Sequence, residues 1–333
     1  MVKWGIFGGA GFIGQHLAHS ILSKFPTDQV DLLDIQSPLG NKCKAPLGSF
    51  LAAKKLLFFD FDVRHINQKL VDTRQFDVIV NLAAIHSEPG HRLEEYFETN
   101  VSGAANICRL ASETGCSEII FTSSISVYGI HDKPVDESSQ TRPNTPYGQS
   151  KLEAENIHKA WAARTGGRLS IIRPGVVFGP GENGNVTRLI RESLKYGRAI
   201  QLEPDQPKAG IYIEELLNLI HWLRLQPLAA GECHLVNGVS NENLSFNDFG
   251  EALQKLQNFE KKPFKVSVPL LKAAILLMKP LGLVLPGTSK IHPVRLSKLT
   301  RANDIRSAEL LTAGYSFSWP LEKALADWIE KGL

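Results

Sequence analysis

Short runs of consecutive hydrophobic residues alternate with helical patterns through the first 180 residues of the chain. Val, Ile, Leu and Phe fill neighbouring positions in each run, which is typical of strands buried on both faces of a parallel sheet. Repetition of strand, helix and strand, joined by right-handed crossovers, predicts an α/β fold with a Rossmann-type, doubly wound parallel sheet. The expected helices are Gly11–Ser23, Leu93–Thr114 and Pro146–Arg164. The expected strands are Lys3–Phe7, Val30–Asp34, Leu56–Asp60, Val78–Leu82, Glu118–Thr122 and Leu169–Arg173.

The regular alternation ends near residue 180. Asn185–Tyr196 and Ile213–Leu225 still show helical patterns. Frequent prolines then divide the chain into short elements and argue against a second regular sheet. We therefore expect a first domain over residues 1–180, to which part of 205–240 returns. A smaller, irregular lobe is expected over 181–333 and should cover the carboxyl edge of the sheet. The prolines of the last part are Pro263, Pro269, Pro280, Pro286 and Pro293.

Composition is that of an ordinary globular protein, with 43% hydrophobic and 21% charged residues. The net charge of +3 is spread along the chain, and without a basic block no nucleic-acid partner is expected. Four scattered cysteines predict free thiols, no metal site and a cytoplasmic location. Lys272, Lys279 and Pro280 interrupt the apolar stretch Val268–Leu285, so neither a membrane span nor membrane contact is expected.

A glycine-rich loop lies between the first strand and the first helix, with glycines at 8, 11 and 14. Gly8 permits a tight turn, Gly11 lets backbone N–H groups approach a pyrophosphate, and Gly14 allows close packing of helix on sheet. Asp34, twenty residues beyond Gly14, ends the second strand, where a carboxylate accepts hydrogen bonds from ribose hydroxyls. Because Asp34 would repel a 2′-phosphate, NAD is expected in preference to NADP. The loop residues expected to contact it are Gly8, Gly11, Phe12, Ile13 and Gly14.

Tyr147 and Lys151 stand four residues apart at the start of an expected helix and therefore share one face. Lowering a tyrosine pKa by about three units takes about 4 kcal/mol. An ammonium about 4 Å away supplies that energy at an effective dielectric constant of about 20. Lys151 could also hold the nicotinamide ribose. Ser124 and Ser126 follow the fifth strand, at the edge where such sheets bind ligands. A solvent-exposed Tyr–Lys pair and a turn-forming serine cluster are the alternatives.

With these motifs in order, the chain resembles an extended short-chain dehydrogenase/reductase of the NAD-dependent epimerase/dehydratase family. The resemblance rests also on Asn81-Leu82-Ala83-Ala84, on Thr99-Asn100-Val101-Ser102-Gly103 and on the segment Arg173–Gly181. It implies a catalytic set of Ser124, Tyr147 and Lys151. It further implies cofactor contacts from Asp62, Val63, Leu82, Ala83, Ala84, Asn100 and Pro174, in addition to Asp34, Tyr147, Lys151 and the glycine loop.

Within that family, Ser124-Ile125-Ser126 resembles the nucleotide-sugar 4-epimerases. The dehydratases carry Thr-Asp-Glu at these positions, and the decarboxylases carry Glu in place of Ser126. The resemblance has one departure, because Val176 replaces the Asn that helps those epimerases to hold the nucleotide sugar. Expected substrate contacts are Ser124, Ser126, Asn185, Arg188 and Arg295.

The resemblance implies an NAD-dependent nucleotide-sugar 4-epimerase that acts through a transient 4-keto sugar, with a UDP-sugar as the favoured substrate. The C-terminal part also resembles relatives of the 3β-hydroxysteroid dehydrogenases. The alternative is therefore an NAD-dependent dehydrogenase or ketoreductase of a sugar or sterol-like alcohol. A non-catalytic NAD-sensing protein is a third reading, against which the intact Ser–Tyr–Lys set argues. In enzymes of this kind the helices Leu93–Thr114 and Pro146–Arg164 pair across a two-fold axis, so a homodimer is expected.

Overall fold

Seven parallel strands form the central sheet of the computed structural model, which describes residues 1–38, 46–65, 73–88, 90–270, 273 and 302–332. The strand order is β10-β6-β5-β4-β1-β2-β3, with every neighbouring pair parallel. The expected doubly wound sheet is therefore confirmed. The strands are β1 (Lys3–Phe7), β2 (Gln29–Asp34), β3 (Leu56–Asp60), β4 (Val78–Asn81), β5 (Glu118–Thr122), β6 (Arg168–Pro174) and β10 (Cys233–Gly238).

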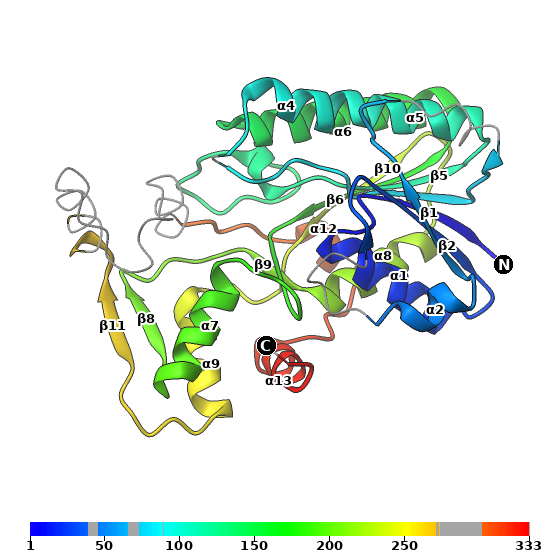
Figure 1. Cartoon of the computed structure of the whole chain (residues 1–333). Coiled ribbons are helices and arrows are strands. Elements are labelled where there is room, and N and C mark those ends of the chain that lie inside the picture. Colours follow the sequence, from blue (N-terminus) through cyan, green and yellow to red (C-terminus); the bar gives the residue numbers. More distant parts are fainter. Residues whose placement is uncertain (39–45, 66–72, 89, 271–272, 274–301, 333) are drawn as a thin grey trace.

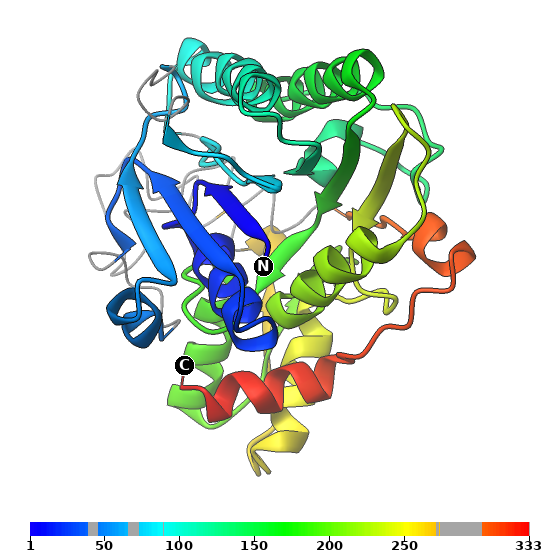
Figure 2. The same ribbon diagram turned by 90° about the vertical axis from the view of Figure 1, so that its right-hand side faces the viewer.

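Helices cover both faces of this sheet (Figure 1). One layer contains α4 (Leu93–Phe97), η2 (Glu98–Ser102), α5 (Gly103–Glu113) and α6 (Pro146–Thr165). The opposite side carries α1 (Phe12–Lys24), α2 (Gly48–Ala52) and α8 (Ile213–Leu225), and the view turned by 90° shows the sheet between the two layers (Figure 2). Each layer buries its own hydrophobic cluster against the sheet, which explains why apolar residues occupy consecutive strand positions.

Two elements differ from the sequence prediction. The expected continuous helix Leu93–Thr114 is interrupted by η2, a π-helical turn that carries the buried Asn100. β10 was not among the expected strands, because polar His234 and Asn237 break up the apolar run around Leu235 and Val236. It nevertheless pairs with β6 over its whole length, after α8 has brought the chain back to the sheet.

The remaining elements lie outside the central sheet and the two helix layers that cover it. α7, α9, β8 and β11 form the lower left part of Figure 1, and α13 packs against α9. In the described part of the chain, only two small two-stranded sheets, β11–β8 and β7–β9, accompany the large one. No helix among the described residues is both long and apolar enough to cross a membrane. The bounds are η3 (Ile125–Tyr128), β7 (Val176–Phe178), α7 (Asn185–Tyr196), β8 (Ile200–Glu203), β9 (Gly210–Tyr212), α9 (Phe246–Leu256), β11 (Phe264–Ser267), α12 (Ala308–Thr312) and α13 (Leu321–Glu330).

Candidate active site

The glycine loop between β1 and α1 has the geometry that a dinucleotide requires. Gly8 has φ +72°, and a Cβ there would lie 2.7 Å from the backbone nitrogen of Ala83. A Cβ on Gly14 would lie 2.6 Å from the Cα of Gly9, so neither position accommodates a side chain. Gly11 precedes α1, and no side chain caps this helix. A pyrophosphate therefore fits the positive end of α1, and Phe12 and Ile13 begin that helix with partly buried side chains.

Asp34, the last residue of β2, binds this loop through a hydrogen bond. Its Oδ2 accepts a hydrogen bond from the Ala10 N–H at 3.0 Å, and its Oδ1 accepts one from the Gln36 N–H at 3.0 Å. Burial raises the pKa of the Asp34 carboxyl, and these backbone donors offset part of that rise. The carboxylate is half-buried beside the loop, where it would face an adenosine ribose.

Cofactor selectivity is the first testable consequence of this carboxylate. We expect NAD⁺ to bind at least about tenfold more tightly than NADP⁺, a difference of about 1.4 kcal/mol, because the 2′-phosphate would meet Asp34 at close range. Titration of the purified protein with each dinucleotide measures the ratio. Asp34→Asn should reduce the ratio of the NAD⁺ affinity to the NADP⁺ affinity. Equal affinities of the wild-type protein for the two dinucleotides would show that Asp34 does not contact the ribose.

Other predicted cofactor residues gather near the same edge of the sheet. Leu82, Ala83 and Ala84 directly follow β4, and Ala83 lies close to Gly8. These residues therefore lie where the chain leaves β1 for one face of the sheet and leaves β4 for the other. Ligands of doubly wound sheets bind at such a switch point. Val63 packs against Gly103, whereas Asp62 forms an ion pair with Arg64 at 2.6 Å. Pro174 ends β6.

Ser124 and Tyr147 come together although 23 positions separate them in the sequence. Ser124 caps η3, because its Oγ accepts a hydrogen bond from the Ser126 N–H at 3.1 Å. Thr145 caps α6 by accepting from the Gly148 N–H at 3.1 Å, which sets Tyr147 in the first turn of that helix. The Ser124 side chain then lies close enough to Tyr147 to lower the pKa of the Tyr147 hydroxyl.

Burial controls the protonation of the Tyr147–Lys151 pair. It raises the pKa of Tyr147 to about 12, the Ser124 side chain lowers it, and the Glu88 carboxylate raises it further. Burial also lowers the pKa of Lys151 to about 7, and Glu155 opposes that shift. The expected lowering of the Tyr147 pKa by Lys151 is therefore wrong for this structure. Helical spacing brings two groups together, but desolvation favours the neutral form of each.

Asn100 connects the π-helical turn to the segment after β4 and to α6. Its Oδ1 accepts from the Ile85 N–H at 2.9 Å, and its Nδ2 donates to the Ile85 carbonyl at 3.1 Å. The same Nδ2 donates to Ser150 Oγ at 2.9 Å, and Ser150 lies between Tyr147 and Lys151 on α6. Asn100 therefore fixes the segment after β4 against the start of α6.

The predicted substrate residues are less concentrated. Ser126 lies beside Ser124, whose hydroxyl donates to the Ser126 hydroxyl at 3.1 Å. Asn185 begins α7, with Gly184 at the cap position, and both Asn185 and Arg188 are exposed. Their contact with a substrate stays a prediction. Arg295 lies outside the described residues.

Comparison with known proteins now decides the family. Residues 4–224 match the NAD dependent epimerase/dehydratase family. The chain belongs to this family. A relative from Escherichia coli O157:H7, N-acetyl-alpha-D-glucosaminyl-diphospho-ditrans,octacis-undecaprenol 4-epimerase, is 25% identical, with 96% of this chain and 92% of that protein covered. UDP-glucose 4-epimerase 2 of Oryza sativa subsp. japonica is 32% identical, but the match covers 46% of this chain and 38% of that protein.

A solved structure of the same fold is that of UDP-glucuronic acid 4-epimerase from Bacillus cereus in complex with NAD. It matches with a TM-score of 0.73 and 20% identity, covering 99% of both chains. As a member of the NAD dependent epimerase/dehydratase family, the protein uses NAD, and the glycine loop and Asp34 fit that cofactor. The part of the chain that the structure describes contains no cluster of His, Cys, Asp and Glu that could hold a metal ion.

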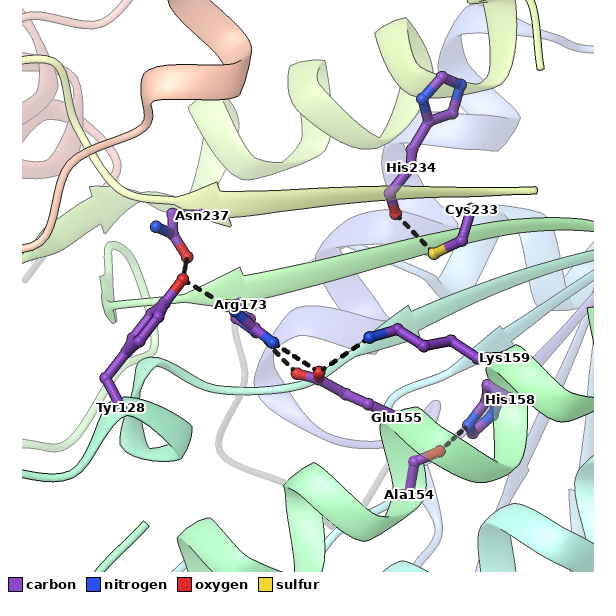
Figure 3. Close-up of polar contacts among 9 residues, drawn as sticks. All are labelled: Tyr128, Ala154, Glu155, His158, Lys159, Arg173, Cys233, His234 and Asn237. Carbon is purple, nitrogen blue, oxygen red and sulfur yellow. Dashed lines mark hydrogen bonds and ion pairs between the residues drawn. The ribbon is translucent and has the colours of Figure 1, made fainter. Parts of the chain in front are cut away.

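Sequence reasoning missed the polar groups that lie beneath the site. Glu155 and Arg173 form a buried ion pair, and Tyr128 and Asn237 extend it (Figure 3). The position of Glu155, four residues after Lys151, was a signal that could have identified it. Nothing local in the sequence indicated its partner on β6.

Proposed function

We propose that this protein is an NAD-dependent nucleotide-sugar 4-epimerase that acts through a transient 4-keto sugar. The observation that carries this proposal is that Ser124, at the cap of η3, lies close to Tyr147 in the first turn of α6, with Lys151 one turn further along that helix. NAD, when bound, supplies a reversible hydride acceptor and a positively charged ring. The residues that would hold it are the glycine loop, Asp34, the segment after β4 and Lys151.

The residues of the chain then supply proton transfer and orientation. The Ser124 hydroxyl orients the sugar 4-oxygen, and the Tyr147 phenolate takes the proton of the 4-hydroxyl. A positively charged Lys151, together with the positively charged ring of bound NAD, would stabilise that phenolate against the burial that raises the Tyr147 pKa. After the ketone has turned over in the site, Tyr147 returns the proton to the same oxygen. Ser126 stands where the related dehydratases and decarboxylases carry a carboxylate, so no second acid–base group is provided there for their chemistry.

A sugar joined to a lipid diphosphate is a second candidate for the substrate. Two observations favour it. Val176, which is 43% exposed, replaces the Asn that helps the related epimerases to hold a nucleotide sugar. The relative named for an undecaprenol-linked sugar matches along 96% of this chain. A net dehydrogenase or ketoreductase acting on a sugar or sterol-like alcohol would use the same three residues. These candidates differ in the carrier of the sugar and in the fate of the cofactor.

Mass spectrometry of the small molecules retained by the purified protein separates these candidates. Tightly held NAD together with a UDP-sugar is the expected result. Recovery of a polyprenyl diphosphate sugar would favour the lipid-linked substrate. An empty site that loads NAD only on addition would favour the dehydrogenase, because an epimerase regenerates its cofactor in each cycle.

The organisation of the chain follows from this function. We propose that residues 1–180, with part of 205–240, bind NAD, and that 181–333 mainly bind the substrate. The proposed location is cytoplasmic, and the proposal includes no nucleic-acid partner or membrane contact. Free Cys108, Cys116 and Cys233 support a reducing environment.

A homodimer is part of the proposal, with α5 and α6 as the contact between two copies. These helices pack side by side in the outer layer of the fold (Figure 1). Sedimentation at micromolar protein concentration should show a dimer. Ala160→Glu, on the exposed side of α6, should shift the protein toward a monomer, whereas Lys195→Glu on α7 should leave the dimer intact. A monomeric wild-type protein would contradict the proposed assembly.

A further inference from the structure

A buried ion pair joins the helix of Tyr147 and Lys151 to the central sheet. Glu155 on α6 is 0% exposed, and Arg173 on β6 is 2% exposed. Arg173 Nε donates to Glu155 Oε1 at 2.8 Å, and its Nη2 donates to Oε2 at 2.7 Å. Arg173 thus binds both carboxylate oxygens of Glu155 in a bidentate contact, the strongest geometry for an Arg–carboxylate pair. Figure 3 shows this contact between α6 and β6.

The ion pair continues to the segment that carries Ser124. Arg173 Nη1 donates to Tyr128 Oη at 2.9 Å, and Tyr128 Oη donates to Asn237 Oδ1 at 2.8 Å. Tyr128 is the last residue of η3, which Ser124 caps, and Asn237 belongs to β10. The network therefore holds α6 and the end of η3 against the same two strands (Figure 3).

The Lys151 side chain is almost completely shielded from water, so its ammonium needs a nearby negative charge. The residue is 1% exposed, and its Nζ lies over the Phe121 ring, 4.3 Å from the ring centroid. An ammonium buried without a counter-charge is costly and tends to lose its proton. Glu155 lies four residues further along α6, so its Cβ is about 5–6 Å from that of Lys151.

The other titratable groups around Lys151 do not replace Glu155. His158, on the same helix, is neutral at pH 7 because burial lowers its pKa to about 4. From β6, Arg173 is compensated by the carboxylate that it binds. Lys159 approaches Glu155 Oε2 at 3.8 Å, with its side chain 40% exposed. Tyr147, one turn before Lys151, is neutral.

We propose that Glu155 is a positioning residue, whose buried carboxylate, held by Arg173, keeps the Lys151 amine protonated in its place over the Phe121 ring. The inference rests on the role of Lys151 in the proposed function. Arg173 prevents the carboxylate from moving toward Lys151 or Lys159, and Tyr128 and Asn237 fix Arg173 in turn. The carboxylate therefore acts on the site without contact with cofactor or substrate.

The pH dependence of NAD⁺ binding tests this proposal without any sugar. A protonated Lys151 would donate to the nicotinamide ribose of bound NAD⁺, so NAD⁺ affinity should fall as the pH rises through the Lys151 pKa of about 7. In Glu155→Gln the loss of negative charge should move this fall to lower pH by about one unit or more. Glu155→Asp keeps the charge and should restore most of the shift.

Two further variants separate positioning from mere stability. Glu118→Gln breaks the partly buried Glu118–Arg224 ion pair of 3.1 Å, at the opposite end of β5, and should lower the melting temperature without moving the midpoint. Glu155→Gln combined with Arg173→Gln leaves no unpaired buried charge and serves if the single variant fails to fold. It should move the midpoint in the same direction but by less, because the positive charge of Arg173 is removed as well. A folded variant of either kind with the wild-type midpoint overturns the proposal. Failure to epimerise sugars would overturn the proposed function alone, because this readout uses only NAD⁺.

Discussion

Replacing Tyr147 by Phe is expected to lower turnover by about 10²–10⁴-fold, the usual contribution of a positioned general acid–base group. The substitution removes the proton acceptor and keeps the ring. The fold and the binding of NAD should therefore survive. Steady-state rates, together with an NAD titration and a melting curve, measure these effects in the same protein samples.

Two control variants show whether the loss belongs to proton transfer. Tyr196→Phe changes an exposed tyrosine on α7, 51% exposed, and should leave turnover unchanged. Ser124→Ala should cost less than Tyr147→Phe, because a hydroxyl that orients the substrate oxygen leaves the base in place. A Tyr147→Phe protein with wild-type turnover would exclude Tyr147 from the chemistry.

Replacing Lys151 by Met is expected to lower turnover by about 10²–10³-fold, the cost of removing one preorganised electrostatic donor. Met fills a similar volume over the Phe121 ring, so the helix should keep its packing. NAD should also bind more weakly, because the ammonium that would hold the nicotinamide ribose is gone. Rates and NAD titrations of the same preparation give both effects.

Lys159→Met is the matched control for this substitution. Lys159 lies two turns further along α6 with its side chain 40% exposed, and its Nζ approaches Glu155 Oε2 at 3.8 Å. Because the Lys159 amine is largely solvated, its contact with Glu155 contributes at most about 1 kcal/mol. Turnover and NAD affinity should therefore remain near wild type. Equal losses in both variants would show that charge on α6, and not the position of Lys151, matters.

The sheet could be predicted because burial on both faces leaves a direct trace in the sequence. Consecutive apolar positions identified six of its seven strands, and the carboxyl ends of parallel strands then brought the glycine loop, Asp34 and Ser124 to one edge. β10 was missed because it carries His234 and Asn237, and Asn237 serves the polar network around Arg173. A strand that contributes to such a network loses the apolar run that reveals strands.

The protonation of the site could not be predicted from spacing alone. The i, i+4 relation placed Tyr147 and Lys151 on one face of a helix, but it gave no measure of their burial. Burial shifts the pKa of each group toward its neutral form. The contact of Glu155 with Arg173 joins two elements across 18 residues, and local patterns do not encode such pairs. The π-helical turn at Asn100 likewise has no signal in the apolar pattern.

The most direct test of the proposed epimerase is the configuration at the sugar C4 after incubation with the protein. Purified protein is incubated with UDP-glucose, UDP-glucuronic acid and UDP-N-acetylglucosamine in turn, NMR follows the C4 proton, and absorbance follows NADH. The proposal predicts an equilibrium mixture of C4 epimers from one of these sugars, with NADH absorbance that is at most transient. Steady accumulation of NADH together with a ketone product, in place of the C4 epimer, would contradict it.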